Sequence, residues 1–251
     1  QEGVQEVSNG SFSQEGAELV LNPNFNDSTW WGLDASWSIL NGAANSNGSG
    51  TMYKGGVLTI GKNYKVVVSV SSYTSGTLSY PNASNTIPSE VGVYTFYYTA
   101  NSQTVSFTGN SFIGSIDNVS VKEVGQDWTL GGSGSNAATI GSNSATITSV
   151  DGNSYIQQNS VLTNGKNYKI SYEILSSSGS SVLKLISSLG LATIPTTVGT
   201  HTVYGTAVST TFYIERLTNG VNATITNISV KEVGQNWTLD DWSVGDSLVS
   251  S

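Results

Sequence analysis

The residues that could carry out catalysis are few and scattered. The chain has one histidine, His201, and no cysteine, and its 17 acidic residues outnumber nine lysines and arginines. Hydrolysis of a glycosidic bond needs two carboxyl groups about 5–9.5 Å apart in a cleft. The acidic residues of this chain instead gather near its two ends and around residues 123–127 and 232. This distribution is typical of a solvated surface, so we expect no enzyme.

Aromatic residues are the stronger candidates for a binding site. Trp30, Trp31 and Trp37 lie close together in the sequence, and Tyr53 follows them. An exposed aromatic ring with polar neighbours can stack on a sugar, and packing in a core is the alternative for each of the four. Trp30 and Trp31 point to opposite sides if their segment is extended, so one should be more exposed than the other. The second half of the chain has Trp128 but no tryptophan pair, so the sequence favours the first half for a carbohydrate site.

Composition excludes several classes of partner. The net charge is −8 and no basic patch is present, which predicts no nucleic-acid binding because phosphate neutralisation supplies most of that affinity. No stretch of about 20 apolar residues occurs, so we expect no membrane insertion. Charged residues make up 10% of the chain, against an average of about 25%. The β-branched and aromatic residues between Ser, Thr, Asn and Gly favour strands over helices.

The chain contains an internal repeat of domain size. It reads VSVKEVGQDWTL from Val119 and ISVKEVGQNWTL from Ile228, so that Lys122 and Lys231 are 109 residues apart. Repeats of this length can be domains with their own cores. We therefore predict two tandem domains, at residues 17–125 and 126–234, with residues 235–251 as the start of a third repeat. Residues 1–16 contain VQEV, an echo of VKEV, and are predicted to be the end of a preceding unit or a lead segment.

Short alternating runs predict the strands of these domains. NYKVVVSVSSY, VYTFYYTA and TVSFTG in the first half, and NYKISYEIL, HTVYGTA and TTFYIERL in the second, alternate apolar and polar residues between Gly, Asn, Pro or Ser. Both faces of several runs are apolar, which favours two packed sheets. The prediction is an all-β fold of two tandem β-sandwich domains. The expected core includes Val66, Val68, Phe96 and Phe107 in the first domain, and Ile170, Tyr172 and Phe212 in the second.

Three segments carry a family resemblance. ELVLNPNFNDSTWW from Glu18, GKNYKVVVSV from Gly61 and IDNVSVKEV from Ile116 resemble the jelly-roll, galactose-binding-like carbohydrate-binding modules. They look most like the tandem versions in bacteriophage tail fibres and other virion appendages. The resemblance implies a structural protein on a virion surface or otherwise extracellular. Its implied partners are other virion proteins, copies of itself and host surface glycans. Two alternatives remain open: a polysaccharide-binding module of a secreted glycoside hydrolase, and a bacterial surface adhesin or filament subunit.

The same resemblance implies one structural calcium ion in the first domain and no other cofactor. Modules of this kind bind calcium between the start of the domain and an aspartate of the last strand. The positions that match are Asp117 and Glu18, with backbone carbonyl groups near Asn24. Calcium takes six to eight oxygen ligands. The second domain has Thr226 in place of Asp117, so the site is expected in the first domain alone, and a turn-capping role for Asp117 is the alternative.

Overall fold

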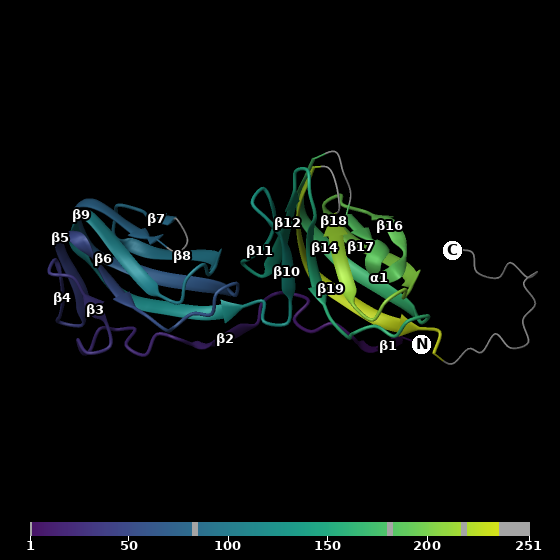
Figure 1. The fold of residues 1–251 in the computed structure, drawn as a ribbon, viewed down its shortest axis with the longest axis horizontal. Helices are drawn as coiled ribbons and strands as arrows, with labels where there is room; N and C mark the ends of the chain where they lie inside the picture. Colours follow the sequence, from purple (N-terminus) through teal and green to yellow (C-terminus); the bar gives the residue numbers. More distant parts are fainter. Residues whose placement is uncertain (1, 82–84, 180–182, 217–219, 236–251) are drawn as a thin grey trace, which may run out of the picture.

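The computed structural model describes residues 2–81, 85–179, 183–216 and 220–235. The fold is all-β, as the sequence predicts. Two β-sandwiches lie side by side along the long axis of the molecule, one built mainly from the first half of the chain and one from the second (Figure 1). Among the described residues, the single helix is the one-turn α1 (Ile186–Leu189). No helix in the described ranges has the length and apolar character needed to cross a membrane.

The first sandwich contains the strands from residue 15 to residue 124. These are β2 (Glu15–Glu18), β3 (Gly32–Leu33), β4 (Trp37–Leu40), β5 (Ala43–Lys54), β6 (Asn63–Tyr80), β7 (Asn85–Ile87), β8 (Gly92–Thr99) and β9 (Val105–Val124). Val66, Val68 and Phe107 are fully buried, as the two-residue period of their runs predicts. Phe96 is only partly buried against the core, because β8 pairs with β6 alone and its outer edge carries no neighbouring strand in the described sheet.

Three long strands build both layers of the first sandwich. β5, β6 and β9 each begin in one layer, bend, and continue in the other, with breaks in the register at Gly48–Gly50 and between Val70 and Thr77. The bend in β6 needs a glycine. Gly76 has φ +79°, and a Cβ atom there would lie 2.0 Å from the Ser111 carbonyl oxygen. A bulge of this kind turns a strand without interrupting the chain.

The second sandwich repeats this plan with shorter strands. They are β10 (Thr129–Ser133), β11 (Asn136–Gly141), β12 (Ser144–Ser149), β13 (Ser154–Gln158), β14 (Asn167–Ser178), β15 (Leu183–Leu185), β16 (Leu191–Ile194), β17 (Gly199–Thr206), β18 (Phe212–Arg216) and β19 (Val221–Val233). By their pairing, β12 and β13 match the two halves of β5, and β18 and β19 match the two halves of β9. Ile170, Tyr172 and Phe212 are buried in its core as predicted.

The amino-terminal segment (residues 2–12) belongs to the second sandwich. Its strand β1 (Glu2–Gln5) pairs antiparallel with β19. Val7 and Phe12 are 3% and 2% exposed in the core of the second sandwich. Gly10 lies so close to β19 that a Cβ atom would come 1.9 Å from the Ile228 carbonyl oxygen. The structure thus places these residues against a domain whose other strands lie more than 100 residues away in the sequence.

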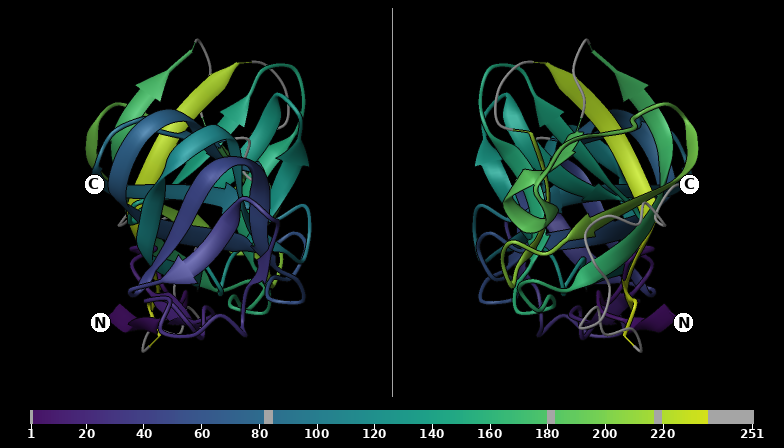
Figure 2. Two further views of the ribbon diagram at one scale, coloured as in Figure 1. Left: turned by 90° about the vertical axis from the view of Figure 1, so that its left-hand side faces the viewer. Right: turned by 90° about the vertical axis from the view of Figure 1, so that its right-hand side faces the viewer.

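The first sandwich is therefore inserted into the second. The chain passes from the amino-terminal segment directly to β2, where Glu15 pairs with Val124 of β9, and returns to the second sandwich through residues 125–128. Both crossings lie at one end of the first sandwich, between the two bodies (Figure 1). Viewed along the long axis, the two sandwiches overlap with the amino terminus at one side (Figure 2). Residues 236–251, nearly all of the predicted start of a third repeat, lie outside the described residues.

A second repeat in the sequence accounts for this arrangement. EGVQEVSNGSF from Glu2 and EGAELVLNPNF from Glu15 share Glu, Gly, Val, Asn and Phe at a constant spacing of 13 residues. The backbone carbonyl oxygen of Asn9 accepts a hydrogen bond from the buried indole of Trp128, and that of Asn22 accepts one from the buried indole of Trp31. The chain thus carries two lead segments in a row, followed by two sandwich bodies.

Candidate functional site

The exposed aromatic face of the first sandwich is formed by Trp30, Tyr53 and Lys54. Tyr53 is 46% exposed, and its ring covers Gly32, where a Cβ atom would lie 2.7 Å from the ring. The Lys54 ammonium group lies 5.4 Å from the centre of the Trp30 ring. Two rings and a cation on a polar surface can stack on and hydrogen-bond a sugar. Lys54 was not predicted from the sequence, although it directly follows Tyr53.

The other two predicted sugar-binding tryptophans lie in the core. Trp31 and Trp37 are 4% and 5% exposed. Their indole N–H groups donate to the backbone carbonyl oxygens of Asn22 and Gly50, at 3.2 and 3.0 Å. The Trp30 ring stands edge-on to Trp31, with 4.5 Å between the ring centres. The adjacent pair thus splits as the alternation predicted, with Trp31 inside and Trp30 partly outside.

Glu18 holds the lead segment of the first sandwich against β9. One of its carboxylate oxygens accepts hydrogen bonds from the backbone N–H groups of Leu19, Val20 and Val121, and the other accepts one from the Ser120 hydroxyl. All of these donors belong to β9 or to the turn that follows β2. The structure therefore gives Glu18 a role in joining the lead segment to β9.

Asp117 lies where the second sandwich has Thr226. The register fixes this equivalence, because Ala44 faces Ile116 as Ala145 faces Ile225. The Thr226 hydroxyl lies within hydrogen-bonding distance of two backbone carbonyl oxygens, those of Asn143 at 2.7 Å and Ser11 at 3.4 Å.

The matching carbonyl groups in the first sandwich are those of Gly42 and Asn24. These two residues approach each other, since a Cβ atom on Gly42 would lie 3.7 Å from the Asn24 carbonyl oxygen. At this position the first sandwich has a carboxylate, which accepts hydrogen bonds from the Asn118 backbone and side chain. An ionised carboxylate donates no hydrogen bond, so by this register the first sandwich has an acceptor at the position where the second sandwich has a donor.

This donor set fits a calcium ion that keeps several of its waters. Calcium accepts carboxylate and carbonyl oxygens, and Asp117, Asn24 and Gly42 supply one carboxylate and two carbonyls. Within the described residues, no group of three or more His, Cys, Asp and Glu side chains comes together as a metal site, so a site here depends on backbone oxygens. Glu18 does not belong to this set. The sequence did not single out Gly42, because a backbone carbonyl leaves no mark on the residue type.

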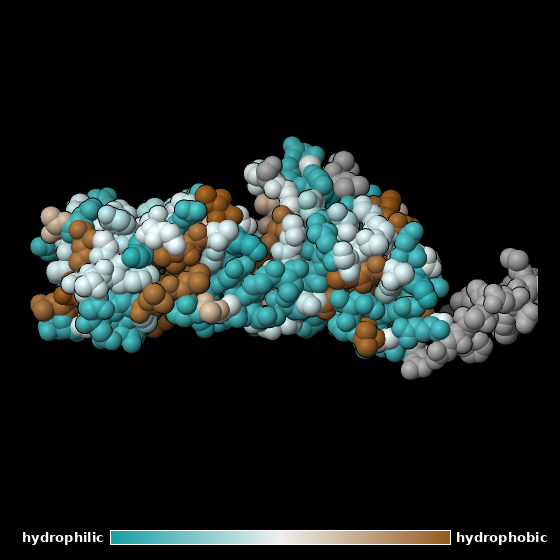
Figure 3. All heavy atoms as spheres, turned by 60° about the horizontal axis from the view of Figure 1, so that its bottom comes forward, coloured by the Kyte–Doolittle hydropathy of each residue, from teal (hydrophilic) through white to brown (hydrophobic). Residues whose placement is uncertain are grey.

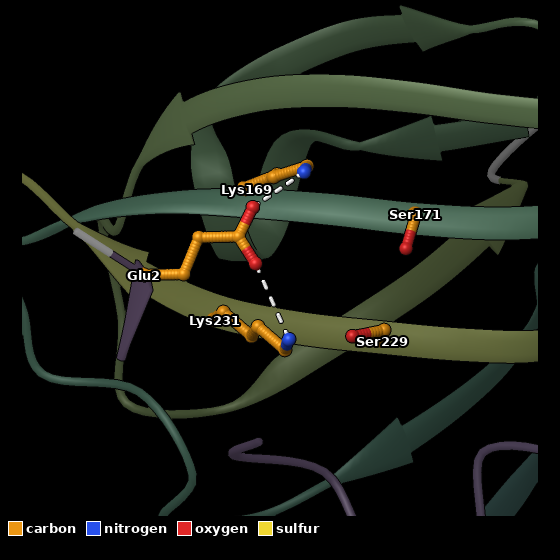
Figure 4. A pocket seen from close by; sticks show the side chains of 5 residues that line it. All are labelled: Glu2, Lys169, Ser171, Ser229 and Lys231. Atoms are coloured by element: carbon orange, nitrogen blue, oxygen red, sulfur yellow. Dashed lines mark hydrogen bonds and ion pairs between the residues drawn. The ribbon is translucent and has the colours of Figure 1, made fainter. Parts of the chain in front are cut away.

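Two matching charge clusters fasten the lead segments. Glu2 bridges Lys169 and Lys231 at 2.5 and 3.2 Å, above a polar cavity of about 110 Å³ that Ser171 and Ser229 also line (Figure 4). In the first sandwich, Glu15 bridges Lys65 and Lys122 at 2.6 and 3.0 Å. The hydrogen bond from Lys169 lowers the pKa of Glu2 below its ordinary value, and that from Lys65 does the same for the pKa of Glu15. Surface pairs of this kind contribute little stability singly, but here each links a lead strand to two others.

The histidine sits in a structural contact. A ring nitrogen of His201 lies 2.6 Å from the Thr197 carbonyl oxygen, and the ring packs 5.5 Å from that of Tyr172. Asp34, the acidic residue near the exposed aromatic face, accepts a hydrogen bond from the backbone N–H of Thr51 at 2.8 Å. Both side chains thus make structural contacts within the first and second sandwich.

The junction between the sandwiches is a packed contact. Val124, 4% exposed, belongs to the buried cluster of the second sandwich, and Tyr97 packs against the same cluster. Gly125 packs closely against Ile140, since a Cβ atom on Gly125 would lie 2.9 Å from the Ile140 side chain. A cavity of about 240 Å³ remains beside this contact. It is lined by Gly61, Asn63 and Thr99 of the first sandwich and by Leu130, Gly131, Gly132, Ala137, Ala138 and Thr139 of the second.

Comparison with known proteins identifies no family. No protein-family model matches the sequence, and no curated protein matches it. Among solved structures, a conserved protein of unknown function from Pseudomonas aeruginosa aligns over 81% of this chain and 81% of its own, with 10% identity and a TM-score of 0.22. At that score the likeness carries no argument about fold or function.

Proposed function

We propose that this chain is a structural spacer of an extracellular assembly, such as a virion tail fibre or capsid-decorating appendage. Its sandwiches set a fixed distance between the parts that they join. The sequence resemblance to tandem jelly-roll repeats of virion appendages motivates the virion setting, and the composition, which is poor in charged residues, free of cysteine and repetitive, is compatible with it.

The observation that carries this proposal is the double crossing between the sandwiches. Two tandem domains joined by one linker can swing about it. Here the chain crosses twice, at residues 13–14 and 125–128, and Gly125 of the return crossing contacts Ile140. Trp128 closes the return crossing by donating a backbone hydrogen bond to the Gly125 carbonyl at 2.9 Å. A hinge motion would have to break the packing of Val124 and Tyr97, so we expect the two bodies to move as one.

Solution measurements test this rigidity directly. Residual dipolar couplings from both sandwiches of the full chain should fit one alignment tensor. A matched control carries flexible Gly–Ser insertions after both Ser13 and Gln126, and should require two tensors. Two independent tensors for the unaltered chain would contradict a spacer role.

The exposed aromatic face favours a second activity, contact with a host surface glycan. Tyr53 is 46% exposed, and the Lys54 ammonium group that follows it in the chain lies over the partly buried ring of Trp30. In the second sandwich the position of Tyr53 is taken by Gln157, which faces Thr129 as Tyr53 faces Gly32. Glycan contact would therefore come from the first sandwich.

The first sandwich is also proposed to hold a calcium ion at Asp117, Asn24 and Gly42. The ion would take the place that the Thr226 hydroxyl has in the second sandwich, linking the lead segment to the last strand and to the β4–β5 turn. Its contribution would be to stability.

The genomic setting separates this proposal from its alternatives. Genes for a portal, a terminase or a tail tube beside the reading frame would support a virion appendage. A glycoside hydrolase domain in the same reading frame would instead make the chain a polysaccharide-binding module, and a cell-wall anchoring signal would indicate a surface adhesin or filament subunit.

A further inference from the structure

Each half of the contact that joins the two sandwiches occurs a second time in the part of the chain that the structure describes, where no described residue packs on it. On the first sandwich, the covered half consists of the ends of three strands: Asn63 of β6, Thr99 of β8 and Val124 of β9 are paired with one another. In the second sandwich, Asn167, Thr206 and Val233 are paired in the same way. The likeness extends to a side-chain hydrogen bond, from Thr99 to Asn63 at 2.8 Å and from Thr206 to Asn167 at 2.7 Å.

The free end of the second sandwich exposes what its counterpart buries. Tyr97 packs on the neighbouring core, whereas the matching Tyr204 is 61% exposed. Gly125 is buried, whereas Gly234 is exposed. A shallow depression of about 460 Å³ lies at this end, lined by Asn167, Tyr168, Tyr204, Gly205, Thr206, Val233 and Gly234. We name these residues the tail face.

The receiving half of the contact recurs on the first sandwich. Ile140, which Gly125 covers, faces Ala145 across the β11–β12 hairpin, and Ile39 faces Ala44 in the same way across β4–β5. Ile140 is 3% exposed, whereas Ile39 is partly buried and the adjacent Leu40 is 63% exposed. Leu33 matches Leu130, since they face Met52 and Ile156 respectively. We name Leu33, Ile39 and Leu40 the head face.

Beside the head face lies an aspartate where the equivalent surface of the second sandwich has a glycine, and this difference does not block the proposed contact. By the same register, Asp34 stands where the second sandwich has Gly131. Its carboxylate folds back to accept the hydrogen bond from Thr51 within its own sandwich.

The two faces lie at opposite ends of the long axis. β3 and β4 form one end of the molecule, and the ends of β14, β17 and β19 lie toward the other (Figure 1). Apolar residues are visible at the end formed by the first sandwich (Figure 3). A contact between one head and one tail is heterologous, and such contacts form open chains when the rotation between copies does not close a ring.

We propose that the tail face binds the head face of a second copy of this chain, in the manner in which the first sandwich binds the second within one copy. The occupant is a second copy because the surface that fits the tail face is present on this chain, and no described residue covers either surface. This inference builds on the proposed structural role and specifies its partner. The result is a head-to-tail row of sandwiches with a nearly uniform repeat.

Sedimentation velocity of the full chain over a concentration series tests the inference. We expect the weight-average sedimentation coefficient to rise with concentration. Tyr204→Glu in the tail face or Leu40→Glu in the head face should each weaken association at least about tenfold, because each places a charge in the contact. Val93→Glu is the matched control: Val93 is 68% exposed at the opposite end of β8 from Thr99, and the change should leave association unaltered.

Mixing the two blocked variants separates head-to-tail binding from other arrangements. Tyr204→Glu keeps a free head and Leu40→Glu keeps a free tail, so the mixture should form dimers and nothing larger. A chain that stays monomeric at every concentration, or a mixture that forms no dimer, would overturn the inference. Association that appears only after truncation behind Gln235 would identify residues 236–251 as the occupant and would also overturn it. Because rigidity is measured on the monomer, the spacer role can stand or fall separately.

Discussion

Gln5 lies against β19 in the register in which Glu18 lies against β9. Gln5 faces Lys231 and Glu18 faces Lys122. The Gln5 amide oxygen accepts hydrogen bonds from the Ser229 hydroxyl and the Val230 backbone N–H. The Glu18 carboxylate accepts the equivalent hydrogen bonds from the Ser120 hydroxyl and the Val121 backbone N–H. A neutral amide and a carboxylate thus perform the same task, so the charge of Glu18 is not what the position requires.

Glu18→Gln should therefore be tolerated, whereas Glu18→Ala should destabilise the first sandwich. The alanine variant leaves the Val121 N–H without its acceptor, and an unsatisfied buried donor costs about 1–3 kcal/mol. Urea unfolding followed by hydrogen exchange of β9 peptides would measure the difference. Equal losses in the two variants would show that the negative charge is needed after all.

Phe12→Ala should destabilise the second sandwich and leave the first intact. Phe12 is buried against Trp128, with 5.1 Å between ring centres, and removing a buried phenylalanine costs about 3–5 kcal/mol. Hydrogen exchange should rise in β10–β19 peptides, more than 100 residues from the substitution. Phe25→Ala is the control and should affect β2–β9 instead. Protection lost from the first sandwich in the Phe12 variant would contradict the inserted arrangement.

The Glu2 cluster should make the second sandwich sensitive to acid. The hydrogen bond from Lys169 lowers the Glu2 pKa from its ordinary value of 4.5, so folding is favoured by the charged form. This contribution is present above pH 4.5 and is lost as the pH falls through the lowered pKa. Glu2→Gln should therefore unfold more readily than the unaltered chain at pH 7, and the difference should vanish at low pH. A difference that persists there would point to a packing effect.

Calcium binding should depend on Asp117 and should be transferable. Titration calorimetry of the full chain with calcium chloride should show binding that Asp117→Thr removes and Glu18→Gln retains. Thr226→Asp should add a second site, because the Ser11 and Asn143 carbonyl oxygens already converge there. A hundredfold excess of calcium over its dissociation constant would stabilise the folded chain by about 2.7 kcal/mol. No heat and no stabilisation in the unaltered chain would leave Asp117 as the cap of the Asn118 turn.

Glycan contact should depend on Trp30 and Tyr53 without turnover. Trp30→Ala and Tyr53→Ala should weaken binding to a panel of bacterial surface polysaccharides while leaving the thermal midpoint nearly unchanged, because both rings are partly exposed. Trp31→Ala is the structural control, since loss of this buried ring should destabilise the fold by about 3–5 kcal/mol. Release of reducing ends from any polysaccharide would show an enzyme instead.

Local patterns predicted the strands well because β-sandwich strands bury alternate residues. Val66, Val68 and Ile170 were placed correctly by this rule, and Phe96 was not, because an edge strand leaves part of its inner face open. The amino-terminal segment was harder to place, since VQEV was matched to the end of a unit. The pairing of Gln5 with Lys231 joins residues far apart in the chain, so the sequence around Gln5 does not indicate it. The repeat of the lead segment at a spacing of 13 residues was the sequence feature that could have indicated it. Backbone carbonyl groups such as that of Gly42, which we propose as a calcium ligand, cannot be recognised from residue types.

The insertion of one sandwich into the other sets an order of folding. Phe12 leaves the ribosome 116 residues before Trp128, which at about 5–20 residues per second is roughly 6–23 seconds. The first sandwich can be complete within that interval, and its pairing of Glu15 with Val124 brings the two crossings together. The loop between Phe12 and Trp128 is then effectively a few residues long, which lowers the entropic barrier to closing it by about 2–3 kcal/mol. The first sandwich thus acts as an internal template for assembly of the second.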